Sequence, residues 1–174
     1  MVDPKLRVLI SSAKIQARIR EMGAEISRDY PDGQLHLICI LKGACFFLTD
    51  LARAMKRDVF VDFMGISTYG KGKTSSGEVK VTKDLDISLE GANVVIVEDI
   101  VDSGVTLNYL MNLLEQRKPK SLRIATLLDK PERRQREVTV TYVGFRIEDK
   151  FVVGYGLDYA EKYRNLDDVC VLEE

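Results

Sequence analysis

The sequence predicts an α/β fold in which one domain is built on a mostly parallel, twisted sheet flanked by helices. Short β-branched apolar runs alternate with segments of helical periodicity, a pattern typical of right-handed βαβ units. The chain has 174 residues, of which 45% are hydrophobic, so it is long enough for one substantial core. Because no repeat, low-complexity stretch or linker divides the chain, we expect a single domain over residues 1–174.

The N-terminal segment predicts an outer helix. Apolar residues recur at roughly helical spacing over residues 6–30, and either Ser11 or Ser12 is available to cap a helix there. Next, the apolar and β-branched run at 35–41 predicts a strand, and residues 44–55 return to helical periodicity. These elements therefore predict a strand, a short loop and a helix after the first helix.

The rest of the chain continues this alternation. A strand at 94–97, a helix from about Gly104 to Gln116 and a strand at 122–129 complete the parallel part of the sheet. Further strands are expected at 59–67, 78–85, 139–145 and 151–156. The last two of these are short and C-terminal, and we expect them to form an appendage to the main sheet.

Polar residues directly follow three of the predicted strands, at Lys42–Gly43, Glu98–Asp99 and Asp129–Lys130. In open α/β sheets, ligands bind outside the carboxyl ends of the strands. The three clusters are therefore expected to converge on one site at that edge of the sheet.

The most informative stretch is "VVIVEDIVDSGVTL", residues 94–107. Four aliphatic residues suit a strand buried on both faces, and carboxylates beside such a strand need hydrogen bonds, a metal or a ligand. Successive N–H groups, hydroxyls and a glycine at 102–106 suit a phosphate at a helix N-terminus, whereas Glu98 and Asp99 suit vicinal hydroxyls or Mg²⁺. The pattern predicts a sugar-phosphate site, and acids that only cap the next helix would not explain all of it.

This pattern resembles the phosphoribosyl pyrophosphate-binding sequence of type I phosphoribosyltransferases. Segments that resemble, in order, the members of this family acting on 6-oxopurines are 40–51, 61–70, 127–134 and 149–166. The resemblance implies the fold of this family, with a small hood of N- and C-terminal segments. It also implies a purine-salvage enzyme that uses Mg²⁺ and transfers the 5-phosphoribosyl group of phosphoribosyl pyrophosphate to N9 of hypoxanthine or guanine, giving IMP or GMP and pyrophosphate.

The resemblance implies roles for the residues on the ribose side of the site. Asp102 is expected to act as the general base that takes the proton from purine N7. Glu98 and Asp99 are expected to hold the ribose hydroxyls and, together with Asp158, to serve as Mg²⁺ ligands. The residues expected to hold the 5′-phosphate are Ser103, Gly104, Val105 and Thr106.

Pyrophosphate contacts are implied for another set of residues, namely Leu41, Lys42, Gly43 and Arg164. The family also leads us to expect a cis peptide bond between the first two of them. Residues 67–81 are rich in glycine, lysine and serine, so we expect a mobile loop that closes over the reaction centre with Thr68 and Tyr69.

Purine contacts are implied for Lys130, Phe151 and Val152. Lys130 is expected to donate a hydrogen bond to O6 of the purine, which adenine replaces with an amino group that cannot accept it. Phe151 is expected to stack on the base, and the backbone of Val152 to read its edge. The preference among hypoxanthine, guanine and xanthine stays open at this stage.

Two other features are given structural interpretations. The stretch "GKGKTSSG" at 70–77 is not a P-loop, because Ser67 stands where that motif needs glycine and a strand follows. His36 is the only histidine, and the three cysteines lack zinc-ligand spacing, so we expect no chemistry from either residue type.

The charge balance limits the partners of the chain. With 26 Lys+Arg against 27 Asp+Glu, no basic field favours nucleic acid or a membrane surface, and no segment suits a signal peptide or a membrane span. We expect a cytoplasmic homodimer or homotetramer. The alternatives are a regulatory relative that binds RNA, which should show a basic face, and a scaffold protein with a degenerate site.

Overall fold

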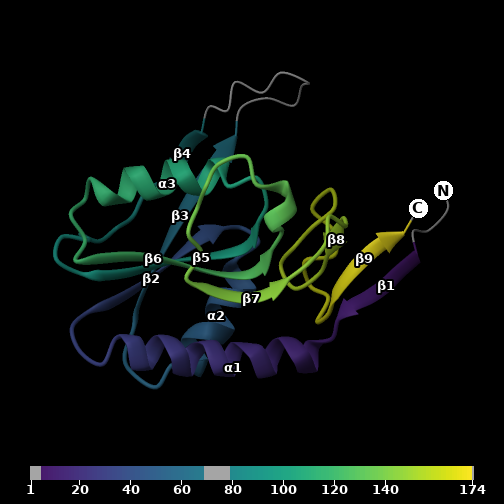
Figure 1. The fold of residues 1–174 in the computed structure, drawn as a ribbon, viewed down its shortest axis with the longest axis horizontal. Coiled ribbons are helices and arrows are strands. Elements are labelled where there is room, and N and C mark those ends of the chain that lie inside the picture. Colours follow the sequence, from purple (N-terminus) through teal and green to yellow (C-terminus); the bar gives the residue numbers. More distant parts are fainter. Residues whose placement is uncertain (1–4, 69–78, 174) are drawn as a thin grey trace.

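A computed structural model describes residues 5–68 and 79–173 of the chain (Figure 1). Its main sheet has six strands, which are, in spatial order, β4 (Val79–Lys83), β3 (Phe60–Thr68), β2 (Leu35–Leu41), β5 (Asn93–Val101), β6 (Ser121–Asp129) and β7 (Tyr142–Arg146). All neighbouring strands in this sheet are parallel except the antiparallel pair of β3 and β4. The predicted α/β fold with a mostly parallel sheet is therefore confirmed.

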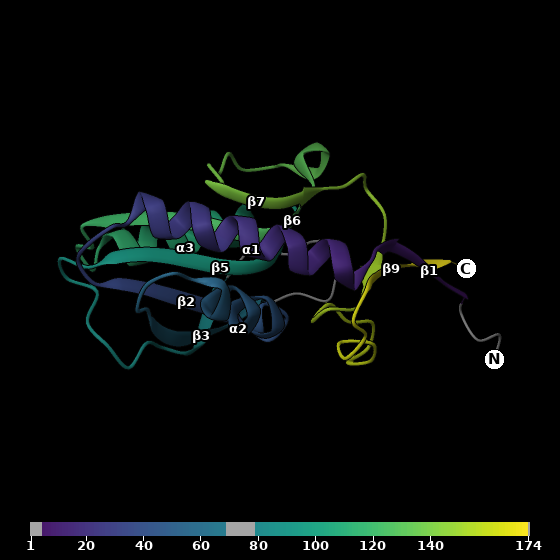
Figure 2. The same cartoon turned by 90° about the horizontal axis from the view of Figure 1, so that it is seen from below.

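Three helices cover the two faces of this sheet. Helices α1 (Ser12–Asp29) and α2 (Cys45–Ala54) lie on one face, and α3 (Val105–Glu115) lies on the other (Figures 1 and 2). Ser11 is the N-cap of α1, with its side chain accepting from the backbone N–H of Lys14. A short 3-10 helix, η1 (Pro131–Arg133), follows β6. The helices predicted at 44–55 and from Gly104 to Gln116 are thus confirmed.

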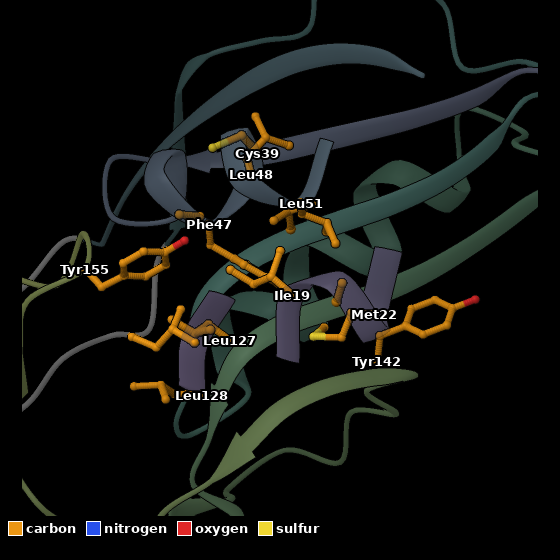
Figure 3. Packing of buried hydrophobic residues seen from close by; sticks show 14 of the residues in the cluster. Ile19, Met22, Cys39, Phe47, Leu48, Leu51, Leu127, Leu128, Tyr142 and Tyr155 are labelled. Atoms are coloured by element: carbon orange, nitrogen blue, oxygen red, sulfur yellow. The ribbon is translucent and has the colours of Figure 1, made fainter. Parts of the chain in front are cut away.

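The core consists of two apolar clusters, one on each face of the sheet. Under α1 and α2, fully buried side chains such as Ile19, Met22 and Phe47 pack against the sheet (Figure 3). Strand β5 contributes to both clusters, because Val94 lies in the cluster under α3 and Val95 in the other. Each fully buried side chain of this size stabilises the fold by about 1.5–3 kcal/mol. The loops at the carboxyl edge of the sheet are therefore anchored to strands that are packed on both faces.

A second sheet of three antiparallel strands forms the hood: β1 (Lys5–Ile10), β9 (Val169–Glu173) and β8 (Val152–Val153). The hood expected from N- and C-terminal segments is confirmed, but the prediction that residues 6–10 belong to the first helix is wrong. Leu6, Val8 and Ile10 alternate along a strand as well as they fit a helix, and their partner strand lies at the other end of the chain. The periodicity of residues 6–10 alone gives no information about their pairing with a strand at the other end of the chain.

The expected appendage of two C-terminal strands is also corrected. Strand β7 joins the main sheet, parallel to β6, with Ala125 opposite Tyr142. Only Val152 and Val153 of the predicted strand at 151–156 form a strand, and it belongs to the hood. The connection from β6 to β7 contains only the short η1, so the long crossover helix that usually indicates parallel pairing is missing there.

Two smaller expectations concern the cysteines and the membrane. All three cysteines are free, and Cys39 and Cys170 are buried, which fits their structural interpretation. No helix within the described residues has both the length and the apolar composition that a membrane crossing requires.

Candidate active site

The loop between β5 and α3 places a helix N-terminus at the carboxyl edge of the sheet. Gly104 adopts a left-handed conformation (φ +78°) and lets α3 begin at Val105. The carbonyl of Asp102 accepts from Arg134 Nη1 at 2.7 Å, and the carbonyl of Ser103 accepts from the N–H groups of residues 135 and 136. Because the first N–H groups of a helix have no partner inside it, the loop offers donors to an anion while its carbonyl oxygens are already engaged.

Glu98 and Asp99 lie near the carboxyl end of β5, where Glu98 is buried and Asp99 is partly buried. Burial raises the pKa of Glu98 well above its usual value, and the neighbouring Asp99 carboxylate adds to this effect. Burial also raises the pKa of Asp99, to about 6, although hydrogen bonds from backbone N–H groups, including that of Ile100 at 2.7 Å, favour its charged form. Two adjacent carboxyl groups held in this way suit a ligand that supplies hydroxyl donors or positive charge.

The loop after β2 lies directly against these acids. The Leu41–Lys42 peptide bond is cis, as the family resemblance implies. A Cβ atom on Gly43 would lie only 1.7 Å from Oδ2 of Asp99, so only glycine allows this approach. The predicted convergence of Lys42–Gly43 with Glu98–Asp99 is therefore confirmed.

A chain of alternating charges joins Asp102 to Lys130. Arg133 Nε lies 3.1 Å from Oδ1 of Asp102, and Arg133 Nη1 lies 3.2 Å from Oδ2 of Asp149. Asp149 Oδ1 is in turn 3.6 Å from Nζ of Lys130, which also donates to the carbonyl of Lys150 at 2.6 Å. Lys130 is 7% exposed, so its ammonium group is held at the site rather than in solvent. The proposed reader of O6 and the proposed base thus belong to one network.

The hood supplies the remaining predicted residues. Phe151 is 54% exposed and meets Tyr159 edge to face, whereas Val152 is buried in β8. Arg164 donates to the carbonyl of Gly156 at 2.7 Å and pairs with Asp158 at 3.0 Å. The Nε atom of Arg164 is buried and has no hydrogen-bond partner among the described residues.

Not every predicted site residue is placed in the same way. Tyr69 lies outside the described residues, as does the side chain of Thr68, so the loop expected at 67–81 stays a prediction. Within residues 5–68 and 79–173, no three Asp, Glu, His or Cys side chains gather as a metal site. Asp158 is paired with Arg164 rather than grouped with Glu98 and Asp99.

Sequence reasoning missed several residues of this network. Arg133 and Asp149 connect the two halves of the purine side, and Arg134 binds both the Asp102 carbonyl and the buried Asp129. Glu161 contacts Lys42 and Arg164. The two consecutive arginines after Lys130 were the available signal, because a basic pair beside an acidic loop favours ion pairing.

Comparison with known proteins identifies the class. The chain matches the model of the phosphoribosyl transferase domain over residues 11–160, and it belongs to this family.

Two curated relatives are hypoxanthine-guanine phosphoribosyltransferases. That of Bacillus subtilis is 50% identical over 167 residues, covering 96% of this chain and 93% of the relative. That of Mycobacterium avium is 51% identical over 172 residues, covering 95% and 85%, respectively. A crystal structure of a hypoxanthine-guanine phosphoribosyltransferase from Bacillus anthracis, with a HEPES molecule in its active site, aligns with a TM-score of 0.93 and 45% identity, covering 98% of this chain and 99% of that one.

Proposed function

We propose that this protein catalyses the Mg²⁺-dependent transfer of the 5-phosphoribosyl group from phosphoribosyl pyrophosphate to N9 of hypoxanthine or guanine in purine salvage. The products are IMP or GMP and pyrophosphate. The observation that carries this proposal is the meeting of a helix N-terminal loop, the adjacent carboxyl groups of Glu98 and Asp99 with raised pKa values, and the buried Lys130 at one edge of the sheet. The names of the two relatives at about half identity support the choice of substrates.

The loop from Ser103 to Thr106 holds the 5′-phosphate in this proposal. The contacts of Asp102 and Ser103 with residues 134–136 support it, because they engage carbonyl oxygens that would otherwise repel an anion. The N–H group of Val105, which donates to Oγ of Ser103 at 3.4 Å, would exchange this partner for the phosphate. Glu98 and Asp99 accept hydrogen bonds from the ribose 2′- and 3′-hydroxyls. Their negative charge also stabilises the oxocarbenium-like sugar that forms as the bond to pyrophosphate breaks.

Asp102 and Lys130 act on the purine. Asp102 takes the proton from N7 while N9 attacks the sugar, and Lys130 donates to O6 on the same edge of the base. The Lys130 ammonium has three donors; the carbonyl of Lys150 uses one and another can face Asp149 at 3.6 Å, so one donor is left for a ligand. Phe151 stacks on the base, and the backbone of Val152 reads its other edge.

The pyrophosphate group lies against the backbone of Leu41, Lys42 and Gly43 and the side chains of Lys42 and Arg164, two cations that both contact Glu161. The buried, unpartnered Nε of Arg164 supports this assignment, since a buried donor requires an acceptor. Mg²⁺ would be held by Asp158 together with Glu98 and Asp99, since carboxylate oxygens are the ligands that it prefers. When bound, Mg²⁺ neutralises the charge of the leaving pyrophosphate.

Four expectations from the sequence are kept as parts of the proposal. They are the single domain over 1–174, the homodimer or homotetramer, the cytoplasmic location and the closing loop with Thr68 and Tyr69. The fold and the family are compatible with each of them.

An ultraviolet assay of four purine bases with phosphoribosyl pyrophosphate and Mg²⁺ tests the proposal. Hypoxanthine and guanine should be converted to their 5′-monophosphates, and adenine should be poorer by about a thousandfold or more in kcat/KM. The reason is that a donor built for O6 is left unpaired by adenine. The kcat/KM for xanthine, compared with those for hypoxanthine and guanine, measures the selectivity of the site for the substituent at C2. Comparable turnover of adenine would refute the assignment of Lys130.

A further inference from the structure

Glu161 bridges the two cations that the proposed function assigns to pyrophosphate. Its Oε2 atom lies 3.0 Å from Nζ of Lys42, and its Oε1 atom lies 3.4 Å from Nη2 of Arg164. One carboxylate therefore contacts two cations that come from segments far apart in the chain. A bound pyrophosphate group would need the same two cations.

The backbone, and not the ion pairs, determines where Glu161 lies. Tyr159 and Lys162 exchange two backbone hydrogen bonds, at 3.1 and 3.0 Å, which close a tight turn around Ala160 and Glu161. Both residues inside the turn have positive φ, +50° and +65°, which is uncommon for residues other than glycine. The Glu161 N–H also donates to Oδ2 of Asp158 at 2.9 Å. The carboxylate is thus presented to Lys42 and Arg164 by a turn that does not depend on the side chain.

We propose that Glu161 sets the affinity of the pyrophosphate subsite by occupying Lys42 and Arg164 until a pyrophosphate group displaces it. This inference rests on the proposed function, because it takes the two cations as pyrophosphate ligands. In the free protein the carboxylate acts as an internal competitor. It must leave both cations when phosphoribosyl pyrophosphate or pyrophosphate binds, and it re-pairs with them when pyrophosphate departs. Glu161 therefore weakens binding at this subsite and favours product release.

The size of the effect follows from exposure. The side chains of Lys42 and Glu161 are 68% and 66% exposed, so water screens their pair strongly. Arg164 is less exposed, at 21%, and its contact with Glu161 is longer. Losing two such contacts, together with one negative charge near a highly charged anion, corresponds to an affinity gain of about three- to tenfold.

Glu161→Gln is the test variant, because it keeps the length of the side chain and the backbone N–H that binds Asp158. Titration calorimetry with pyrophosphate at fixed Mg²⁺ should show about three- to tenfold tighter binding than in the wild type. Pyrophosphate should also become a correspondingly stronger inhibitor against phosphoribosyl pyrophosphate. Both differences should shrink at high salt, because the competing ion pairs are screened. Most substitutions that disturb a site weaken binding, so a merely structural role predicts the opposite sign.

Two control variants make the result specific. Glu173→Gln removes one charge and one ion pair, with Arg7 at 2.5 Å, from an exposed position in the hood sheet, and should leave pyrophosphate affinity unchanged. Glu161→Asp keeps the charge but withdraws the carboxylate from both cations, so its pyrophosphate affinity should lie between those of the wild type and Glu161→Gln. Equal or weaker binding by Glu161→Gln would overturn the inference.

Lys42→Gln separates this inference from the proposed function. If it weakens pyrophosphate binding while Glu161→Gln changes nothing, the subsite stands and only the role of Glu161 fails. If Lys42→Gln binds pyrophosphate as the wild type does, the pyrophosphate site itself is wrong, and the inference fails with it.

Discussion

The acidic side chains of the candidate site fall into two groups with opposite surroundings. Glu98 and Asp99 are held at the end of β5, where burial raises the pKa of both carboxyl groups. Asp102 and Asp158 lie nearer to solvent, and each pairs with an arginine, Arg133 at 3.1 Å and Arg164 at 3.0 Å. Among the described residues, neither carboxyl group of the first pair forms an ion pair, although Arg164 lies close enough to Asp99 to favour its charged form, whereas each carboxylate of the second pair contacts an arginine directly.

This difference suggests different roles for the two groups of carboxylates in the proposed reaction. Burying a carboxylate without a cation costs free energy, which a ligand that donates hydrogen bonds or brings a cation can offset. Glu98 and Asp99 are therefore suited to bind ribose hydroxyls and Mg²⁺. An acid that is already paired with arginine must exchange partners during the reaction. Asp102 and Asp158 are thus suited to act on groups whose charge changes, namely the purine proton and the leaving pyrophosphate.

The largest expected effect concerns Asp102. General acid–base assistance typically contributes about 10²- to 10⁴-fold, so Asp102→Asn should lower kcat by that order. The affinity for phosphoribosyl pyrophosphate should stay within several-fold of the wild type, because the backbone of the loop is retained. Steady-state kinetics with hypoxanthine measure both quantities.

Asp149→Asn is the matched control for this prediction. Asp149 pairs with the same arginine as Asp102, and the exposed fractions of the two side chains are similar, 47% and 42%. Because Asp149 takes no proton in the proposed reaction, its loss should cost far less in kcat. If Asp102→Asn turned over at a rate close to that of the wild type, Asp102 would lose the role of base.

The next prediction concerns Asp99 and the pH dependence of the free energy of unfolding. Because the pKa of Asp99 is about 6 in the folded chain against a usual 3.8, the folded state keeps a proton that the unfolded state releases between these pH values. The stability that this proton provides is present at low pH and is lost as pH rises through about 6. Asp99→Asn should therefore stabilise the ligand-free protein at pH 8 by about 1–3 kcal/mol, and by much less at pH 4. Urea unfolding at both pH values gives the comparison.

Asp84 provides a control of opposite sign. A backbone hydrogen bond from Leu85 and the pairing with Arg117 lower the pKa of Asp84, so its charged form stabilises the fold. Asp84→Asn should thus destabilise the protein at pH 8, and this loss should disappear at low pH. A gain for Asp99→Asn that did not depend on pH would show that burial does not govern this carboxyl group.

The contrast also shows how much of the site the sequence could predict. Residues 94–107 form a strand, a loop and a helix that are contiguous, so local pattern was sufficient for Glu98, Asp99 and the phosphate loop. The raised pKa of Glu98 could be anticipated from its place after four aliphatic residues. The ion pairs could not, because Arg133 meets Asp102 across 31 positions of sequence. Contacts of that kind depend on how the 3-10 helix after β6 is placed, which periodicity does not determine.

The same limit explains the errors in the fold. Strand β1 finds its partner at the opposite end of the chain, and β7 joins the main sheet without a crossover helix. β1 is held by pairing with a distant segment and β7 by pairing with the preceding strand β6, so neither strand is specified by its own local sequence pattern. Where an element is specified within about fifteen residues, as α2 and α3 are, the prediction and the structure agree.

A smaller effect is expected for Asp158, on the Mg²⁺ concentration that the reaction requires. Asp158→Asn should raise the Mg²⁺ concentration needed for half-maximal activity by about tenfold, because a hard cation loses a charged oxygen ligand. Asparagine preserves the size of the side chain and an oxygen that can accept the Glu161 N–H at the same position. Activity titrated with MgCl₂ at fixed phosphoribosyl pyrophosphate measures the shift. An unchanged titration curve would remove Asp158 from the set of metal ligands.

The smallest expected effect extends the comparison to a buried base at the other end of the sheet. His36 is the second residue of β2, is 4% exposed and stacks on Phe60, and neither ring nitrogen has a hydrogen-bond partner among the described residues. Burial lowers the pKa of His36 below its usual 6.5, although the nearby Asp62 opposes this shift.

For a histidine with a lowered pKa, the unfolded chain binds the proton first, so stability is full above about pH 6.5 and is lost as pH falls below it. His36→Leu removes both this titration and the unsatisfied nitrogens, and should stabilise the protein by about 1 kcal/mol at pH 8. The gain should be larger at pH 5.5. Urea unfolding of variant and wild type at each pH isolates this contribution, because Asp99 titrates in both proteins and cancels in the difference. Since His36 is the only histidine, a gain of equal size at both pH values would mean that its ring takes up a proton as easily in the folded chain as in the unfolded one.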